Sequence, residues 1–121
     1  MIGTDAPLLP HQLERLCRRA ALGLARTGSV AGNGSGDIFI AFSTANAAIA
    51  ETERAVSVSM LPNDRMGPLF EATVGATEEA IVNALVAGRT TTGFRGHTVV
   101  GLPLDRVRDM LKRHGLLEPV R

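Results

Sequence analysis

The chain has 121 residues, of which 45% are hydrophobic and 21% are charged, and its formal net charge is +1. This length fits one globular domain, and the balanced charge argues against nucleic acid or an anionic membrane as the main partner. The absence of Trp and Tyr, with four Phe, argues against an aromatic platform for stacked bases. No stretch reaches the roughly 20 apolar residues of a membrane span, and the N-terminus lacks the pattern of a signal peptide. The single cysteine, Cys17, excludes an internal disulfide and fits a reducing compartment, so we expect a cytoplasmic protein.

The first part of the chain predicts a strand end, a helix and a second strand. Residues 1–4 have the character of a strand whose beginning is missing. Residues 8–26 place apolar side chains three and four positions apart, as in an amphipathic helix, with Pro10 suited to its first turn and Gly28 to its C-terminal cap. Residues 38–42 are almost wholly apolar, which is typical of a strand buried on both faces of a sheet.

The second part predicts two helices joined by irregular segments. Residues 55–61 alternate apolar and polar side chains, as a short half-exposed strand does, and residues 66–87 carry the clearest helical stripe. Residues 89–98 form a glycine-containing loop, residues 99–102 return to the core, and a last short helix runs from Pro103 to about residue 113. We find no internal repeat or domain linker.

These elements are too few for a self-sufficient sheet. A strand such as residues 38–42 needs neighbours on both edges, and the chain offers at most one or two. Because an unpaired buried N–H or C=O group costs about 1–3 kcal/mol, a row of them would offset much of a small domain's stability. We therefore expect another chain, or a preceding segment, to complete the sheet.

A glycine-rich loop leads into the second predicted strand and holds the best candidate site residues. Gly34-Ser35-Gly36-Asp37 lies directly before the apolar run. Side chains alternate along extended backbone, so Ser35 and Asp37 should emerge on the same side at the start of the strand. A hydroxyl beside a carboxylate, at the end of a strand, suggests part of a site. The alternative is a flexible connector of turn-forming residues.

Other chemistries find less support in the sequence. The glycine spacing resembles a phosphate loop, but such loops follow a strand and open a helix, whereas this one follows a helix and opens a strand. Ser35, His97 and Asp37 can be assembled into a triad on paper, although the sequence supplies no geometry for it. His97 is the histidine to watch, because it lies in a glycine-rich loop. Metal-ligand spacing is absent, and we expect neither a metal nor a cofactor.

Charged residues on the two long predicted helices favour solvated faces over binding sites. We expect a solvated face, rather than an anion site, for the arginines of the first helix: Arg15, Arg18, Arg19 and Arg26. We expect the same, rather than a metal or acid–base cluster, for the carboxylates of the second: Glu71, Glu78 and Glu79.

Several segments together resemble one family of enzymes. The segments are residues 4–13, which include Thr-Asp-Ala-Pro, and residues 18–29, 34–46, 69–74 and 76–80. They resemble the self-processing serine aminopeptidases, a group that comprises L-aminopeptidase/D-amidase-esterases and β-peptidyl aminopeptidases. The similarity covers nearly the whole sequence and points to the C-terminal, or β, chain of these enzymes.

The resemblance implies an α/β fold, a sandwich of two sheets between helices like that of the ornithine acetyltransferases. Residues 1–121 would be a single partial domain, the C-terminal portion of a larger enzyme. Such enzymes cut themselves before a serine, which becomes the N-terminal nucleophile with its own amine as base. The family's Gly-Ser-Gly-Asp/Glu motif maps onto Ser35 and Asp37, which would orient that nucleophile.

The sequence departs from the family pattern at its start. The family's β chain opens with the nucleophilic serine, whereas this sequence begins at Met1 within the same strand. We therefore expect the chain alone to be inactive and to need an α chain or preceding segment of the same precursor. Its substrates would be small peptides, amides or esters, and the enzyme would be oligomeric. The alternative is a catalytically inactive remnant, or an interaction module that pairs with a partner chain.

Overall fold

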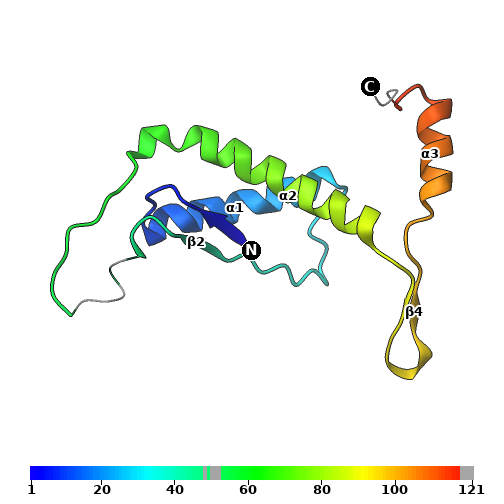
Figure 1. Cartoon of the computed structure of the whole chain (residues 1–121), viewed down its shortest axis with the longest axis horizontal. Helices are drawn as coiled ribbons and strands as arrows, with labels where there is room; N and C mark the ends of the chain where they lie inside the picture. Colours follow the sequence, from blue (N-terminus) through cyan, green and yellow to red (C-terminus); the bar gives the residue numbers. More distant parts are fainter. Residues whose placement is uncertain (48, 50–52, 118–121) are drawn as a thin grey trace. The chain divides into compact units, whose positions relative to one another are not determined.

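A computed structural model describes residues 1–47, 49 and 53–117, and the chain divides into two compact units, Met1–Ile81 and Val82–Arg121. Helices and strands are mixed along the chain (Figure 1). The elements are β1 (Ile2–Thr4), α1 (Pro10–Arg26), β2 (Ala41–Ser43), η2 (Asn63–Arg65), α2 (Gly67–Ala87), β3 (Thr91–Thr92), η3 (Phe94–Gly96), β4 (Thr98–Val99) and α3 (Leu104–Arg113). Within the described residues, no helix is both long and apolar enough to cross a bilayer.

Helix α1 begins and ends where its sequence signals place it. Pro10 occupies the first turn, where its missing N–H costs no hydrogen bond. Gln12 caps this end, because its Oε1 accepts the N–H of Leu9 at 3.1 Å. At the other end Gly28 has a φ of +99°, and its N–H donates to the carbonyl of Ala25 at 3.0 Å. The predicted glycine cap is therefore confirmed.

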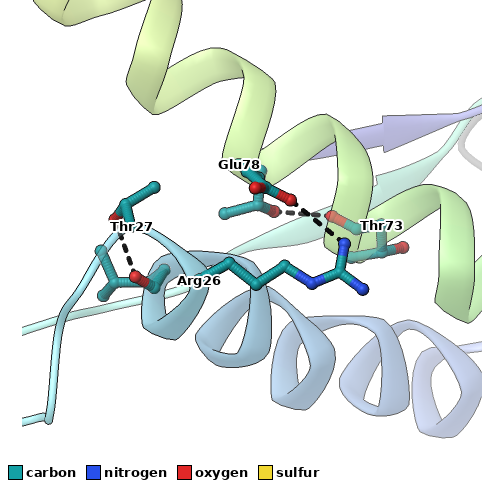
Figure 2. Close-up of polar contacts among 6 residues, drawn as sticks. Arg26, Thr27, Thr73 and Glu78 are labelled. Atoms are coloured by element: carbon teal, nitrogen blue, oxygen red, sulfur yellow. Dashed lines mark hydrogen bonds and ion pairs between the residues drawn. The ribbon is translucent and has the colours of Figure 1, made fainter. Parts of the chain in front are cut away.

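The core of the first unit joins segments that are far apart in the sequence. Leu8, Leu16 and Met66 are at most 3% exposed and pack together. Helices α1 and α2 lie side by side, and Arg26 Nη1 contacts Glu78 Oε2 at 3.1 Å between them (Figure 2). Their close approach depends on Gly23, since a Cβ there would lie 2.5 Å from the carbonyl oxygen of Val74.

The two strands of the first unit pair in parallel, with Ile2 opposite Ala41. The prediction of a strand over residues 38–42, buried on both faces, is wrong in extent and in burial. Only Ala41–Ser43 is a strand, while Ile38 is 85% exposed and Ile40 is 58% exposed. Within the described residues, β1 is the only strand that pairs with β2 and reaches back no further than Ile2, so residues 38 and 39 have no ladder partner.

The prediction of a strand over residues 55–61 is also not met, because no ladder forms there in the described chain. The segment nevertheless passes from Ala55 to Leu61 without a turn or bend. Leu61 is half-buried against the core, and its N–H donates to the carbonyl of Pro7 at 2.8 Å. The alternation of apolar and polar side chains predicts extended backbone, but it does not say whether a neighbouring strand is present to pair with it.

The second unit contains the end of α2, a hairpin and α3. The predicted loop at residues 89–98 instead folds into a short antiparallel hairpin, in which Thr91 faces Val99 and Thr92 faces Thr98. The predicted return to the core at residues 99–102 is wrong, since Val99 is 73% exposed and Val100 is 76% exposed. Two-residue strands bury little, so their apolar side chains stay in contact with solvent.

Candidate functional site

The loop between α1 and β2 is shaped by its own short-range hydrogen bonds. The N–H of Ser35 donates to the carbonyl of Gly32 at 2.8 Å, which closes a turn. Earlier in the loop, the N–H of Ala31 donates to Ser29 Oγ at 3.3 Å, and Ala31 has a φ of +47°. A folded turn of this kind presents the next residues in a defined order at the start of β2.

The structure brings the two candidate side chains together. Ser35 Oγ donates to Asp37 Oδ2 at 2.5 Å, and both residues are exposed. Among the described residues this is the only polar contact of either side chain. The bond uses the hydroxyl proton, so the lone pairs of Ser35 Oγ and the second carboxylate oxygen of Asp37 are left to accept from another donor. The pair can therefore hold and orient a hydroxyl or an amine.

The pair lies before β2, at the end of the sheet where β1 begins. The N–H of Ile2 donates to the carbonyl of Ile40 at 2.8 Å, which continues the parallel ladder one step back toward the loop. Because the strands are parallel, their N-termini lie at the same end of the sheet. Ser35 and Asp37 thus precede β2 in the sequence, on the side of the sheet where both strands begin.

His97 lies in the second unit and is exposed. Its carbonyl accepts the N–H of Gly93 at 2.8 Å and its N–H donates to the carbonyl of Phe94 at 3.3 Å, so its backbone closes the hairpin. Ser35 and Asp37 belong to the first unit, and a role for His97 stays a prediction. His11 in α1 and His114, the residue after α3, are exposed.

Two polar side chains that sequence reasoning missed hold the segment before α2. Gln12 is fully buried, and its Nε2 donates to the carbonyl of Leu61 at 2.7 Å and to Asn63 Oδ1 at 3.0 Å. Asn46 bonds both backbone groups of Ser59, at 3.0 and 3.1 Å. Their partners are remote in sequence, so no local pattern could have indicated these roles.

Two of the four arginines of α1 are less solvated than predicted, whereas Arg18 and Arg26 are exposed as predicted. Arg15 and Arg19 are half-buried, with guanidinium carbons 5.0 and 3.9 Å from the centre of the Phe70 ring. Glu78, expected in solvent, is half-buried and pairs with Arg26. A hollow in this region is lined by Arg19, Leu22, Arg26, Phe70, Glu71 and Val74 and includes neither Ser35 nor Asp37.

Within the described chain, no three side chains of His, Cys, Asp or Glu gather as a metal site would require. The Ser35–Asp37 pair supplies hydrogen bonding and negative charge through its hydroxyl and its carboxylate.

Comparisons with protein families and known proteins show which family the chain belongs to. The model of peptidase family S58 matches residues 1–99. The beta-peptidyl aminopeptidase BapA of Sphingosinicella microcystinivorans is 51% identical over 115 residues, which are 94% of this chain and 29% of that protein. The chain thus spans less than a third of the length of this curated relative.

Solved structures give the same relationship. The L-aminopeptidase D-Ala-esterase/amidase of Ochrobactrum anthropi, a prototype serine aminopeptidase with a variant of the Ntn hydrolase fold, superposes with a TM-score of 0.81 at 40% identity. The match covers 94% of this chain and 32% of that one. A beta-aminopeptidase from a Burkholderia species superposes with a TM-score of 0.78 at 47% identity, covering 96% of this chain and 35% of that one.

Proposed function

The chain belongs to peptidase family S58, and from that premise we propose that it is the C-terminal part of a serine aminopeptidase. Its 121 residues form a single partial domain of a larger α/β enzyme, a sheet sandwich flanked by helices like that of the ornithine acetyltransferases. The complete enzyme removes N-terminal residues from short peptides, amides or esters. The share of the curated relative that the chain spans, 29%, supports a larger folded body around it.

One observation carries this proposal: the bond between Ser35 and Asp37 at the shared end of the parallel strands. Ser35 and Asp37 lie six and four residues before Ala41 in the sequence, and Ala41 is paired with Ile2. If backbone before Ile2 continued β1 in the same register, its positions six and four residues before Ile2 would lie opposite Ser35 and Asp37. A nucleophilic serine at one of these positions would contact Ser35 and Asp37. That serine is not among these 121 residues.

Each part of such a site has a separate task. The hydroxyl of the N-terminal serine attacks the carbonyl carbon, and its own α-amine accepts the proton. Backbone donors hold the oxyanion while the C–N or C–O bond breaks, and the leaving amine or alcohol takes up a proton. Water then attacks the ester of the acyl-enzyme and restores the serine. Ser35 and Asp37 accept hydrogen bonds from the nucleophile and fix its direction of attack, which is a positioning role.

Alanine variants of the pair test this role in the full-length S58 polypeptide that contains this segment. Ser35→Ala or Asp37→Ala should lower kcat for hydrolysis of an amino-acid p-nitroanilide about a hundredfold. Because the pair acts as a unit, the double variant should lose little more than either single one. Ser29→Ala, in the same loop but outside the pair, is the matched control and should keep its activity. Unchanged kcat in both single variants would refute the roles of Ser35 and Asp37.

The alternative function is an inactive module that pairs with a partner chain. Its support is the exposed apolar surface beside the site, where Ile38 is 85% exposed and Phe42 is 46% exposed. Co-expression of the chain with the remaining segment of an S58 precursor separates the two functions. Hydrolysis in the complex, with none by the chain alone, would favour the enzyme. A stable complex without hydrolysis would favour the module.

A further inference from the structure

The ladder between β1 and β2 is too short to define its register by itself. Each strand has three residues, and Gly3 stands at the centre of β1. At one end of the ladder the N–H of Ile2 donates to the carbonyl of Ile40 at 2.8 Å. At the other end the N–H of Thr44 donates to the carbonyl of Thr4 at 3.0 Å. A glycine-containing ladder of this length specifies its register weakly, so contacts outside the ladder are needed to fix it.

The hydroxyl of Ser43 makes one such contact. Ser43 is the last residue of β2 and is half-buried, and its Oγ donates to the carbonyl of Ala6 at 2.6 Å. The same Oγ accepts the N–H of Ala45 at 3.2 Å, and the carbonyl of Ala6 also accepts the N–H of Leu8 at 2.8 Å. Ser43 therefore ties the bend that follows β1 to the chain that follows β2. A shift of one strand along the other by one residue is about 3.3 Å, which would break this bond.

On the outer face of the ladder, an aromatic ring occupies the space above a glycine. Phe42 stands opposite Gly3, and a Cβ on Gly3 would lie 2.9 Å from Cζ of the Phe42 ring. The ring thus packs on the backbone of β1 where a side chain would otherwise stand, an arrangement that pins the register of designed sheets. Gly3 is the only glycine among residues 1–5, so a shifted register offers the ring no such place.

The register of β1 decides where a residue that precedes β1 lies. In the proposed active site the nucleophile precedes β1 and lies opposite Ser35 and Asp37. A shift of one residue would carry it about 3.3 Å along the sheet and turn its side chain to the other face. A displacement of about 1 Å can already lower a rate about a hundredfold. This inference rests on the proposed function: we propose that the Ser43 hydroxyl, together with the Phe42 ring on Gly3, fixes the register of β1 and so positions the nucleophile.

Ser43 is a positioning residue, because it acts through β1 and not on the substrate. Ser43→Val and Ser43→Thr test this role in the full-length S58 polypeptide that contains this segment, since valine and threonine have the same shape and only threonine keeps a hydroxyl. We expect Ser43→Val to lower kcat for an amino-acid p-nitroanilide about tenfold and to change KM less than about twofold, because only the alignment of the nucleophile is lost. Ser43→Thr should keep kcat within about twofold of that of the parent enzyme.

Thr44→Val is the matched control for the loss of a hydroxyl in this part of the chain. Thr44 Oγ1 lies 3.5 Å from the carbonyl oxygen of Thr4, at the limit of a hydrogen bond. The variant keeps the N–H of Thr44, which donates to the same carbonyl. We therefore expect kcat to remain within about twofold of that of the parent enzyme.

Disulfide trapping reads the register itself, without hydrolysis, in the 121-residue chain with Cys17→Ala as background. Ile2→Cys with Ala41→Cys joins register partners about 4.8 Å apart, within the range that a disulfide spans. Ile2→Cys with Phe39→Cys is the matched pair for a register shifted by two residues, and in the observed register these positions lie about 8 Å apart. We expect only the first pair to cross-link in the parent chain and in Ser43→Thr, and both pairs to cross-link in Ser43→Val.

Three results would overturn the inference. One is a kcat for Ser43→Val equal to that for Ser43→Thr, in an enzyme that Ser35→Ala impairs. Another is an equal loss of kcat in Thr44→Val, which would show that this part of the chain is sensitive to any substitution. The third is a second cysteine pair that stays unlinked in Ser43→Val. The proposed function fails by a different result, unchanged kcat in Ser35→Ala and Asp37→Ala, and the cross-links would then still show whether Ser43 fixes the register.

Discussion

The two units differ in how they cover their apolar side chains. In Met1–Ile81, Leu16 is 2% exposed and Met66 is fully buried. In the second unit, none of the described residues 82–117 is buried, and Val100 is 76% exposed. Both units contain helices and paired strands, so regular secondary structure is not what separates them.

What separates them is the sequence distance over which contacts form. In the first unit, the Gln12 side chain bonds the carbonyl of Leu61, and Leu8 packs with Met66. In the second unit, the recorded hydrogen bonds join near neighbours, as in the hairpin where Gly93 bonds His97. Local bonds shape a helix or a hairpin, but only elements brought together from distant positions make a core. We therefore expect the first unit to carry the chain's cooperative stability.

The largest effect should come from emptying the core of the first unit. Leu16→Ala removes a side chain that is 2% exposed, and we expect a loss of about 3–4 kcal/mol in the free energy of unfolding. Met110→Ala in α3 is the matched control: this side chain is 53% exposed, and its loss should cost less than about 0.5 kcal/mol. Urea unfolding followed by circular dichroism measures both. Equal losses would mean that the second unit is as well packed as the first.

A smaller loss should follow when the two long helices are forced apart. Gly23→Ala would place a Cβ 2.5 Å from the carbonyl oxygen of Val74, and we expect a loss of about 2–3 kcal/mol. Gly75→Ala makes the same change in α2, where a Cβ would meet nothing within 4 Å, and it should stabilise the chain by about 0.5–1 kcal/mol. The two variants should therefore shift the urea midpoint in opposite directions. Shifts of the same sign would show that the α1–α2 distance is not set by Gly23.

The same distinction between local and long-range contacts explains which parts of the fold the sequence predicted. Helix α1, its proline start and its glycine cap were predicted because each signal lies within a few residues of its effect. The proximity of Ser35 and Asp37 was predicted for the same reason, since they are two positions apart. The hairpin at residues 91–99 was missed because threonines and glycines are equally typical of a loop.

Contacts between distant segments could not be predicted in this way. Residues 38–42 have the composition of a buried strand, yet Ile38 is 85% exposed, because composition does not say whether a neighbour is present. The two hydrogen bonds between the Asn46 side chain and the Ser59 backbone, and the stacking of Arg19 on Phe70, have no local signature either. Each depends on the packing of elements that the sequence separates.

Removing one buried polar side chain that makes long-range contacts should have an intermediate effect. Gln12→Leu leaves the carbonyl of Leu61 without its donor, and we expect a loss of about 1–2 kcal/mol. Asn63→Ala removes another partner of Gln12, but an exposed one, and should cost less than about 0.5 kcal/mol. Urea unfolding gives both values, and hydrogen exchange at the Leu61 amide shows whether the segment before α2 loosens. A Gln12→Leu variant as stable as the parent chain would contradict a long-range origin of the first unit's stability.

The smallest effect should come from the hairpin of the second unit, where only local geometry is at stake. Arg95 has a φ of +55°, a conformation that glycine adopts more readily, and its guanidinium carbon lies 5.1 Å from the centre of the Phe94 ring. Arg95→Gly removes the backbone strain and should stabilise the hairpin by about 0.5 kcal/mol, even after loss of the ring contact. Exchange of the Gly93 amide, which bonds the carbonyl of His97, should then slow about twofold. Arg95→Ala loses the same ring contact but keeps the strained φ, so its exchange should be faster than in the parent chain. If both variants exchange alike, the ring contact rather than the backbone holds the hairpin, and even the second unit would then depend on side-chain packing.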